Sequence, residues 1–304
     1  MAHESAALNY FVVDVFTDTA LAGNPLAVVM NTADLTTAQM QSIAREFNLS
    51  ETTFVERRAA EIEAVEGIRT RIFTTEEELP FAGHPTLGTA SVLRIADPSL
   101  AFKTTITLAE NIGPIPVVFN PARKGLFGEM TQRDPEFGPE LDPARVAGLL
   151  GLALDDLDSA HTPQIVSTGN GFVIVMLRLL DALARLNVHQ QEAAQYLRPF
   201  GGRWFYVLSP ESVQNENGAK RYRARMQFNS GEDPATGSAA GCAISYLVSR
   251  GIVSSGEQIH VRQGIEMGRP SDLFLSAKLD NTRVTEVRVA GSTVLVATGT
   301  LLVP

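Results

Sequence analysis

The chain has 304 residues and a net charge of −9; 44% of its residues are hydrophobic and 19% are charged. This composition is typical of a globular protein with one large or two medium domains. The acidic balance argues against a nucleic-acid partner or an anionic membrane surface, but it leaves room for a pocket that binds a small anion. Cys242 is the single cysteine, which excludes an intrachain disulfide and favours a cytoplasmic location.

The sequence shows no targeting or membrane signal. The first residues carry neither a basic segment nor an apolar one, so we expect no signal peptide. The longest apolar run, residues 171–177, is too short to cross a bilayer. We therefore expect no membrane partner.

The first 120 residues predict strands and two helices. Residues 35–49 form an amphipathic pattern with apolar side chains at helical spacing, and Thr36 with Gln39 predicts a capping box. A charged turn precedes the fourth strand, and a loop at 74–85 leads into a second helix from Pro85. Strands are predicted at residues 9–16, 24–30, 52–55, 67–74 and within 106–120.

The rest of the chain begins with a Pro- and Gly-rich linker between Asn120 and Pro143. The stretch "GEDPATGSAAG" at 231–241 precedes an apolar helical run, so Asp233 is interpreted as the N-cap and Pro234 as the first helical residue. Further elements are predicted as helices at 142–152 and 180–197, a strand pair within 162–177, strands at 203–209 and 222–228, and a strand-rich tail from 258 to 303.

An internal echo indicates two similar halves. "PTLGTA" at 85–90 matches "PATGSA" at 234–239, and "AGNPLAVV" matches "TGNGFVIV" at nearly the same separation along the chain. Two matches at one separation predict halves of about 150 residues. We assign residues 1–120 to the first half, which the last strands at about 290–304 could complete, and residues 121–304 to the second.

The echo also predicts an anion site. His84 aligns with Asp233, and each precedes a helix that begins with small residues. If the halves face each other, two helix N-termini converge on one cleft with an ionisable side chain at each lip. Unpaired backbone N–H groups and the helix dipole would then bind a carboxylate or phosphate.

Common cofactor motifs do not occur. The stretch from Gly231 to Ser238 lacks the lysine and the spacing of a phosphate loop, and no dinucleotide, nucleophile-elbow or zinc motif is present. We therefore predict no metal and no cofactor.

Several motifs together resemble the PhzF-like family of phenazine biosynthesis. The matching stretches are "GNPLAVV", "IAREFNLSETTFVE", "RIFTTEEELPFAGHPTLGTA", "GEDPATGSAAG" and "QGIEMGRPS". Residues 120–145 have no recognised counterpart. The resemblance implies the diaminopimelate-epimerase-like fold: a mixed α/β (α+β) protein of two pseudo-symmetric halves, each a barrel-like β-sheet around a central helix. It also implies a homodimer.

The resemblance further implies a chemistry. The family's best-understood activity isomerises trans-2,3-dihydro-3-hydroxyanthranilate by moving a proton along the ring, without a cofactor. Glu51 matches the family's proton shuttle, and a buried carboxyl with a raised pKa suits that task. The alternative is an exposed glutamate in a turn between a helix and a strand.

Other site residues follow from the same matches. His84 and Asp233 align with residues that contact the substrate and assist proton transfer, although each could instead be a plain helix cap. The substrate carboxylate would meet Ser50, Gly83, Gly237 and Ser238. Arg269 lies in a matching motif but receives no role, and Cys242 is interpreted as a small buried hydrophobe.

Of three alternatives, one is excluded and two stay open. A two-base epimerase of this fold uses a cysteine at each helix N-terminus, where this chain has His84 and Asp233, so the single Cys242 excludes that mechanism. A lyase or epimerase-like enzyme acting on another hydroxy or amino acid would suit the same site. A non-catalytic small-molecule binder is the third possibility.

Overall fold

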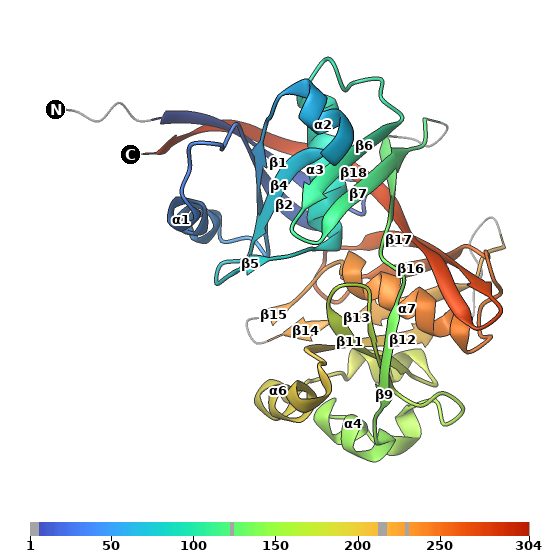
Figure 1. The fold of residues 1–304 in the computed structure, drawn as a ribbon. Coiled ribbons are helices and arrows are strands. Elements are labelled where there is room, and N and C mark those ends of the chain that lie inside the picture. Colours follow the sequence, from blue (N-terminus) through green and yellow to red (C-terminus); the bar gives the residue numbers. More distant parts are fainter. Residues whose placement is uncertain (1–5, 122–124, 212–217, 229–230, 304) are drawn as a thin grey trace. The chain divides into compact units, whose positions relative to one another are not determined.

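The computed structural model describes residues 6–121, 125–211, 218–228 and 231–303. The chain forms two compact units, which are described separately: unit 1 is Met1–Met130 with Gly291–Pro304, and unit 2 is Thr131–Ala290 (Figure 1). The sequence predicts that the first half ends at residue 120, whereas the first segment of unit 1 ends at Met130. No helix among the described residues is long and apolar enough to cross a membrane.

Unit 1 is a closed barrel with a helix inside it. Its helices are α1 (Thr37–Phe47), α2 (Ala60–Glu66) and α3 (Gly83–Ala96). Its strands are β1 (Ala6–Val15), β2 (Asn24–Met30), β3 (Thr52–Glu56), β4 (Ile68–Phe73), β5 (Glu78–Leu79), β6 (Thr105–Glu110), β7 (Gly113–Phe119), β8 (Leu126–Thr131) and the last part of β18 (Arg283–Val303). Among the described residues, eight strands close in the order β1-β2-β3-β4-β6-β7-β8-β18, because β18 pairs back to β1.

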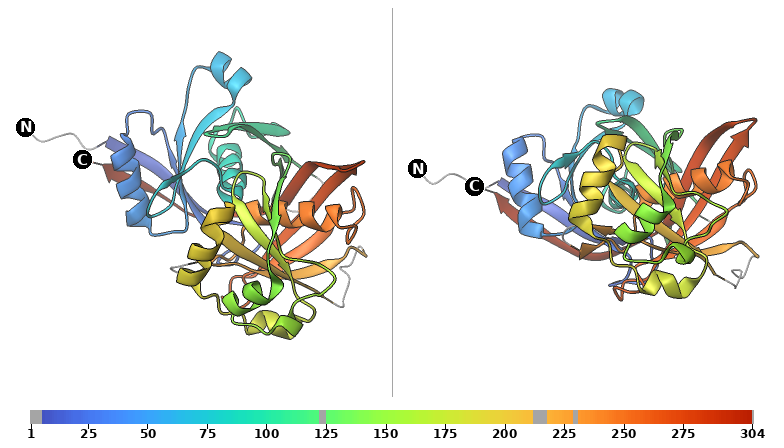
Figure 2. Two further views of the ribbon diagram at one scale, coloured as in Figure 1. Left: turned by 60° about the horizontal axis from the view of Figure 1, so that its bottom comes forward. Right: turned by 90° about the horizontal axis from the view of Figure 1, so that it is seen from below.

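Helix α3 is the core of this barrel (Figures 1 and 2). It packs against β1, β2, β6 and β7, and residues 83–93 are all buried. Small residues make this burial possible, since a helix enclosed on every side must be apolar or small all round. The predicted central helix is therefore confirmed in unit 1.

Helix α1 packs on the outside of the barrel. Its buried residues Met40 and Ile43 join an outer cluster that includes Phe54 and Phe73. The predicted capping box is confirmed. The Thr36 hydroxyl accepts from the Gln39 backbone N–H, and the Gln39 side-chain oxygen accepts from the Thr36 backbone N–H. The charged turn predicted before β4 is wrong: that stretch forms helix α2, which buries none of its residues.

Unit 2 repeats the plan around a second helix. Its helices are α4 (Pro143–Leu149), α5 (Leu180–Ala184), α6 (Gln190–Leu197), α7 (Gly237–Ser249) and the 3-10 turns η1 (Leu154–Asp156) and η2 (Arg198–Phe200). Its strands are β9 (Glu136–Glu140), β10 (Gln164–Ser167), β11 (Gly171–Met176), β12 (Trp204–Pro210), β13 (Arg221–Arg225), β14 (Gln227–Phe228), β15 (Gly231–Glu232), β16 (Ile259–Gln263), β17 (Ser271–Asp280) and the first part of β18. Helix α7 packs against β10, β11 and β17, and residues 237–248 are buried.

The order of strand pairing shows that the echo in the sequence is structural. From β1 through β2, β3, β4, β6, β7 and β8 the pairs run antiparallel, parallel, antiparallel, parallel, antiparallel, antiparallel. The series β10, β11, β12, β13, β16, β17 and β18 repeats this alternation. The predicted fold of two pseudo-symmetric halves is confirmed at the level of topology.

The single helix predicted at 180–197 is wrong, because the structure has α5 and α6 there. Between them, the backbone N–H of Asn187 donates to the Leu150 carbonyl and that of Val188 donates to the Gln227 side chain. These tertiary partners satisfy the groups that a continuous helix would have paired internally. The apolar periodicity of the segment could not reveal this break.

Gly241 on α7 lies against the buried side-chain amide of Gln132. The Gln132 side chain donates to the Gly237 carbonyl at 2.9 Å and accepts from the Thr168 hydroxyl at 2.7 Å. A Cβ atom at Gly241 would lie 2.0 Å from Gln132 Oε1. The glycine therefore makes room for a side chain that ties the start of unit 2 to α7.

We expect Gly241→Ala to lower the free energy of unfolding by about 2 kcal/mol. The added methyl would displace the Gln132 amide and leave buried polar groups unpaired, which outweighs the roughly 1 kcal/mol gain in helix propensity. Urea unfolding measures the change. Gly148→Ala is the matched control, because a Cβ there meets nothing within 4 Å, and it should be neutral or slightly stabilising. Equal effects of the two variants would contradict the prediction.

Candidate active site

The structure brings Glu51 and His84 together in unit 1. Glu51 lies in the connection from α1 to β3, after Asn48 ends α1 in the left-handed conformation with φ 50. His84 is the second residue of α3 and is only 3% exposed. Glu51 Oε2 lies 3.6 Å from His84 Nε2. The two residues that the sequence placed in separate motifs thus face each other at the N-terminus of the central helix.

The His84 ring is neutral. Burial lowers its pKa to about 3, against a smaller opposing contribution from the backbone of Pro25. The Asn24 amide nitrogen lies 3.2 Å from His84 Nδ1. A neutral ring forms no ion pair with Glu51, so the contact joins a neutral imidazole and a carboxyl group.

The distance between these groups is longer than a hydrogen bond, which for N–H to oxygen is about 2.7–3.2 Å. His84 Nε2 is buried and makes no hydrogen bond to any described residue. Such contacts in ligand-free active sites often tighten only when the substrate is bound. The arrangement is suited to a carboxylate that accepts and returns a proton beside a neutral imidazole.

Helix α3 begins two residues earlier than expected. Gly83 is its first residue and Ala82 its N-cap, without a side-chain hydrogen bond, so His84 is not a cap. Pro85 is accommodated because the first-turn N–H groups of a helix have no intrahelical partner. Gly83 is buried at this terminus, and Ser50 is half-buried beside Glu51 in the chain. Their proposed contact with a substrate stays a prediction.

In unit 2, the interpretation of Asp233 as an N-cap is wrong. Helix α7 begins at Gly237 with Thr236 as its N-cap, and Asp233 lies before it, 9% exposed. The Thr236 hydroxyl donates to Asp233 Oδ2 at 2.6 Å. Asp233 is therefore a buried acid that accepts a hydrogen bond from Thr236, and Pro234 is not helical.

Gly237 and Ser238 are the first two residues of α7, and both are buried. The backbone N–H groups at such a terminus carry the positive end of the helix dipole and suit an anion. Because each unit is described by itself, the expectation that this terminus and that of α3 face one cleft stays a prediction.

Two residues without an assigned role are now located. Arg269 lies in the loop between β16 and β17, where its backbone N–H donates to the Gly264 carbonyl. Cys242 is fully buried on α7, and burial raises the pKa of its thiol to about 11. The interpretation of Cys242 as a small buried hydrophobe agrees with this environment.

Glu110 is a buried acid that the sequence reasoning missed. It ends β6, is 5% exposed, and its Oε1 lies 2.6 Å from the Thr86 hydroxyl of α3. Burial raises the pKa of Glu110 to about 8, against opposing contributions from Thr86 and Arg69. No spacing signal could have found it, because its burial depends on the barrel closing over α3.

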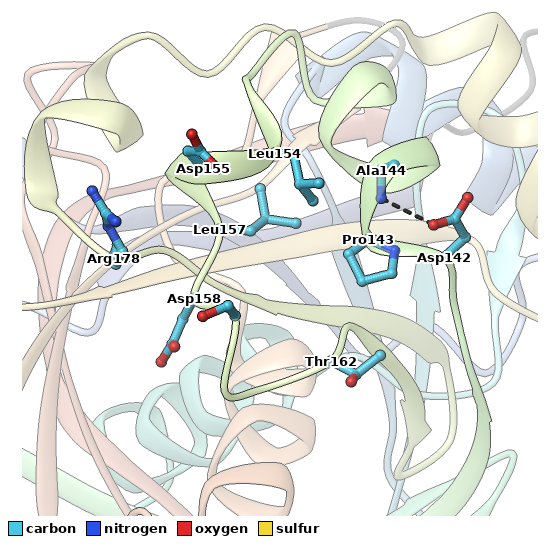
Figure 3. A pocket seen from close by; sticks show the side chains of 10 residues that line it. Asp142, Pro143, Ala144, Leu154, Asp155, Leu157, Asp158, Thr162 and Arg178 are labelled. Carbon is cyan, nitrogen blue, oxygen red and sulfur yellow. Dashed lines mark hydrogen bonds between the residues drawn. The ribbon is translucent and has the colours of Figure 1, made fainter.

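A pocket of about 340 Å³ lies elsewhere in unit 2 (Figure 3). Figure 3 shows Asp155, Asp158 and Arg178 around it, while the Asp142 carboxylate accepts from the Ala144 backbone and so caps α4. None of the predicted site residues lines this pocket. Among the described residues, no group of three or more His, Cys, Asp or Glu side chains could hold a metal ion.

Comparison with known proteins places the chain in a family. The model of the PhzC-PhzF family, phenazine biosynthesis-like protein, matches residues 13–299. An uncharacterized isomerase of Mesorhizobium japonicum is 36% identical over 97% of this chain and 99% of its own length. The trans-2,3-dihydro-3-hydroxyanthranilate isomerase of Pseudomonas fluorescens is 34% identical, over 97% of this chain and 99% of its own.

A solved structure agrees in fold. The phenazine biosynthesis protein of the PhzF family from Bacillus anthracis superposes with a TM-score of 0.84 at 26% identity, covering 98% of this chain and all of that one. The matches run along nearly the whole length of the sequence and through both units. The chain belongs to the PhzC-PhzF family of phenazine biosynthesis-like proteins.

Proposed function

We propose that the protein is a cofactor-independent isomerase that moves a proton within a small cyclic carboxylate of the trans-2,3-dihydro-3-hydroxyanthranilate kind. The observation that carries the proposal is the Glu51 carboxylate facing the neutral, buried His84 at the N-terminus of α3. Relatives 33–34% identical are named for that isomerisation. The geometry supports the proposal, because a carboxyl group and a neutral imidazole lie together at this helix terminus.

Glu51 carries the proton in this proposal. Its carboxylate removes a proton from one ring carbon, the electron pair shifts along the conjugated system, and the same carboxyl returns the proton to another carbon. His84 Nε2 forms a hydrogen bond with a polar substrate group, and Asp233 holds the substrate's polar substituents. Ser50 and the helix-terminal residues Gly83, Gly237 and Ser238 bind the substrate carboxylate.

A single shuttle favours isomerisation over inversion. Inversion by two thiols needs two cysteines, and Cys242 is the only one in the sequence. Its thiol is buried within α7, where a raised pKa disfavours the reactive thiolate. We further propose that the enzyme acts as a cytoplasmic homodimer, as the family resemblance implies.

The proposal is tested by proton exchange. In D₂O, the protein should convert trans-2,3-dihydro-3-hydroxyanthranilate to its isomer, and NMR should show ring deuteration that requires the enzyme. Protein unfolded by heat is the blank. Binding of a stable analogue without exchange would contradict the isomerase assignment and leave a binder or another substrate. Neither exchange nor binding would contradict the substrate class as well.

A further inference from the structure

Thr236 occupies the N-cap of α7 but does not cap the helix. An N-cap threonine ordinarily accepts a hydrogen bond from a backbone N–H of the first turn, and this one makes no such bond. Its hydroxyl instead contacts Asp233 Oδ2 at 2.6 Å and Gln263 Nε2 at 2.9 Å. The Thr236 side chain thus hydrogen-bonds Asp233 and Gln263 instead of the first turn of α7.

Gln263, the last residue of β16, is completely buried and has every hydrogen-bonding position filled. Its Nε2 donates to the Asp233 carbonyl at 2.7 Å and to the Thr236 hydroxyl at 2.9 Å. Its Oε1 accepts from the Thr236 backbone N–H at 3.1 Å and from the Tyr206 hydroxyl at 3.0 Å. An amide has two protons and two lone pairs, so this network admits one orientation.

That orientation fixes the direction of the Thr236 hydroxyl. Because the Gln263 amide donates into the hydroxyl oxygen, the hydroxyl proton is left to point at Asp233. The Asp233 carboxylate therefore receives a directed donor, while its backbone carbonyl is held by the same amide. A fully satisfied buried network of this kind is rigid and holds one geometry.

The loop after Gln263 closes on the segment that carries Asp233. Gly264 has φ +75, and a Cβ there would lie 2.4 Å from the Arg269 carbonyl and 2.7 Å from the Pro234 carbonyl. The "QGIEMGRPS" stretch, which received no role from the sequence, is thus the structural support of the "DPATG" stretch.

We propose that Thr236 and Gln263 are positioning residues that orient the Asp233 carboxylate for the substrate. This inference rests on the proposed function, in which Asp233 binds the substrate. In this proposal the Thr236 hydroxyl orients the Asp233 carboxylate, and the Gln263 amide on β16 sets the direction of that hydroxyl.

The deciding pair of variants is Thr236→Val and Thr236→Ser. Valine keeps the shape but removes the hydroxyl, and no helix cap is lost with it. We expect kcat for the ring-proton shift to fall about 10- to 100-fold in Thr236→Val with little change in melting temperature. Thr236→Ser should restore kcat to within about threefold of the wild type. Thr285→Val, on β18, is the matched control and should leave kcat unchanged. A Thr236→Val enzyme with wild-type kcat would overturn the proposal.

A second readout does not need catalysis. In protein labelled with ¹³C at aspartate carboxyls, the carboxyl chemical shift of Asp233 should change in Thr236→Val, because a hydrogen-bond donor to that carboxylate is lost. It should return to the wild-type value in Thr236→Ser. An inactive wild type whose Asp233 signal responds in this way refutes the proposed function but keeps the positioning network. An unchanged chemical shift refutes the network itself.

Gln263→Glu tests the amide directly. Glutamate keeps an oxygen for Tyr206 and for the Thr236 backbone but loses both amide protons. The Thr236 hydroxyl would then turn toward the new carboxylate, and kcat should fall as in Thr236→Val. Wild-type kcat in a folded Gln263→Glu enzyme would count against the role of Gln263.

Discussion

Glu51→Gln should lower kcat for the ring-proton shift by about 10²- to 10⁴-fold, the range that general acid–base catalysis contributes. Glutamine has the same size and keeps an amide group beside His84, but it neither removes nor returns a proton. Binding of a stable substrate analogue should change little. The measurement is NMR-detected isomer formation and deuteration in D₂O, with calorimetry for analogue binding.

The control for charge removal is Glu46→Gln, at an exposed position on α1. It should leave kcat and the melting temperature unchanged. Near-normal turnover of Glu51→Gln would show that another group shuttles the proton. A loss of analogue binding equal to the loss of kcat would instead make Glu51 a binding residue.

Local sequence patterns predicted the structure best where the interacting groups are close together in the sequence. The capping box of α1 formed as expected, since both of its partners lie within one turn. The alternation of the strands and the internal echo led to the repeated pairing order. The dipeptide Asp-Pro shows where prediction from the local sequence fails. At one of its occurrences, Asp142 and Pro143 are the N-cap and first residue of α4, as expected for this dipeptide before a helix.

Asp233 and Pro234 do not follow that rule, because the Gln263 side chain binds the segment between them and α7. Gln263 is distant in the sequence, so its influence has no local signature. The contact of Glu51 with His84 likewise depends on how the α1–β3 connection meets the start of α3. Motif matching selected these residues, whereas only the structure gives their distance and the neutral state of the ring.

Glu110 illustrates a further property that depends on the tertiary fold. The Thr86 hydroxyl has one proton and shares it between the Ala82 carbonyl at 2.7 Å and Glu110 Oε1 at 2.6 Å. This shared bond only partly offsets burial, which raises the pKa of Glu110 to about 8. The Arg69 guanidinium opposes this rise without cancelling it.

A raised pKa makes stability depend on pH in a defined direction. Between the ordinary carboxyl value of 4.5 and about 8, the folded state keeps the Glu110 proton while the unfolded chain loses it. The folded state then binds more protons, so the free energy of unfolding falls as pH rises, by up to about 1.4 kcal/mol per pH unit. Over the whole window the loss approaches about 5 kcal/mol.

Glu110→Gln should remove this dependence. Glutamine keeps an oxygen that accepts from the Thr86 hydroxyl, but it does not ionise. Relative to wild type, the variant should therefore gain free energy of unfolding steadily between pH 5 and pH 8, measured by urea unfolding at each pH. Glu76→Gln, in an exposed turn, is the control and should follow the wild type. Parallel pH profiles for Glu110→Gln and wild type would mean that Glu110 ionises normally, and that α3 rests on a charged carboxylate.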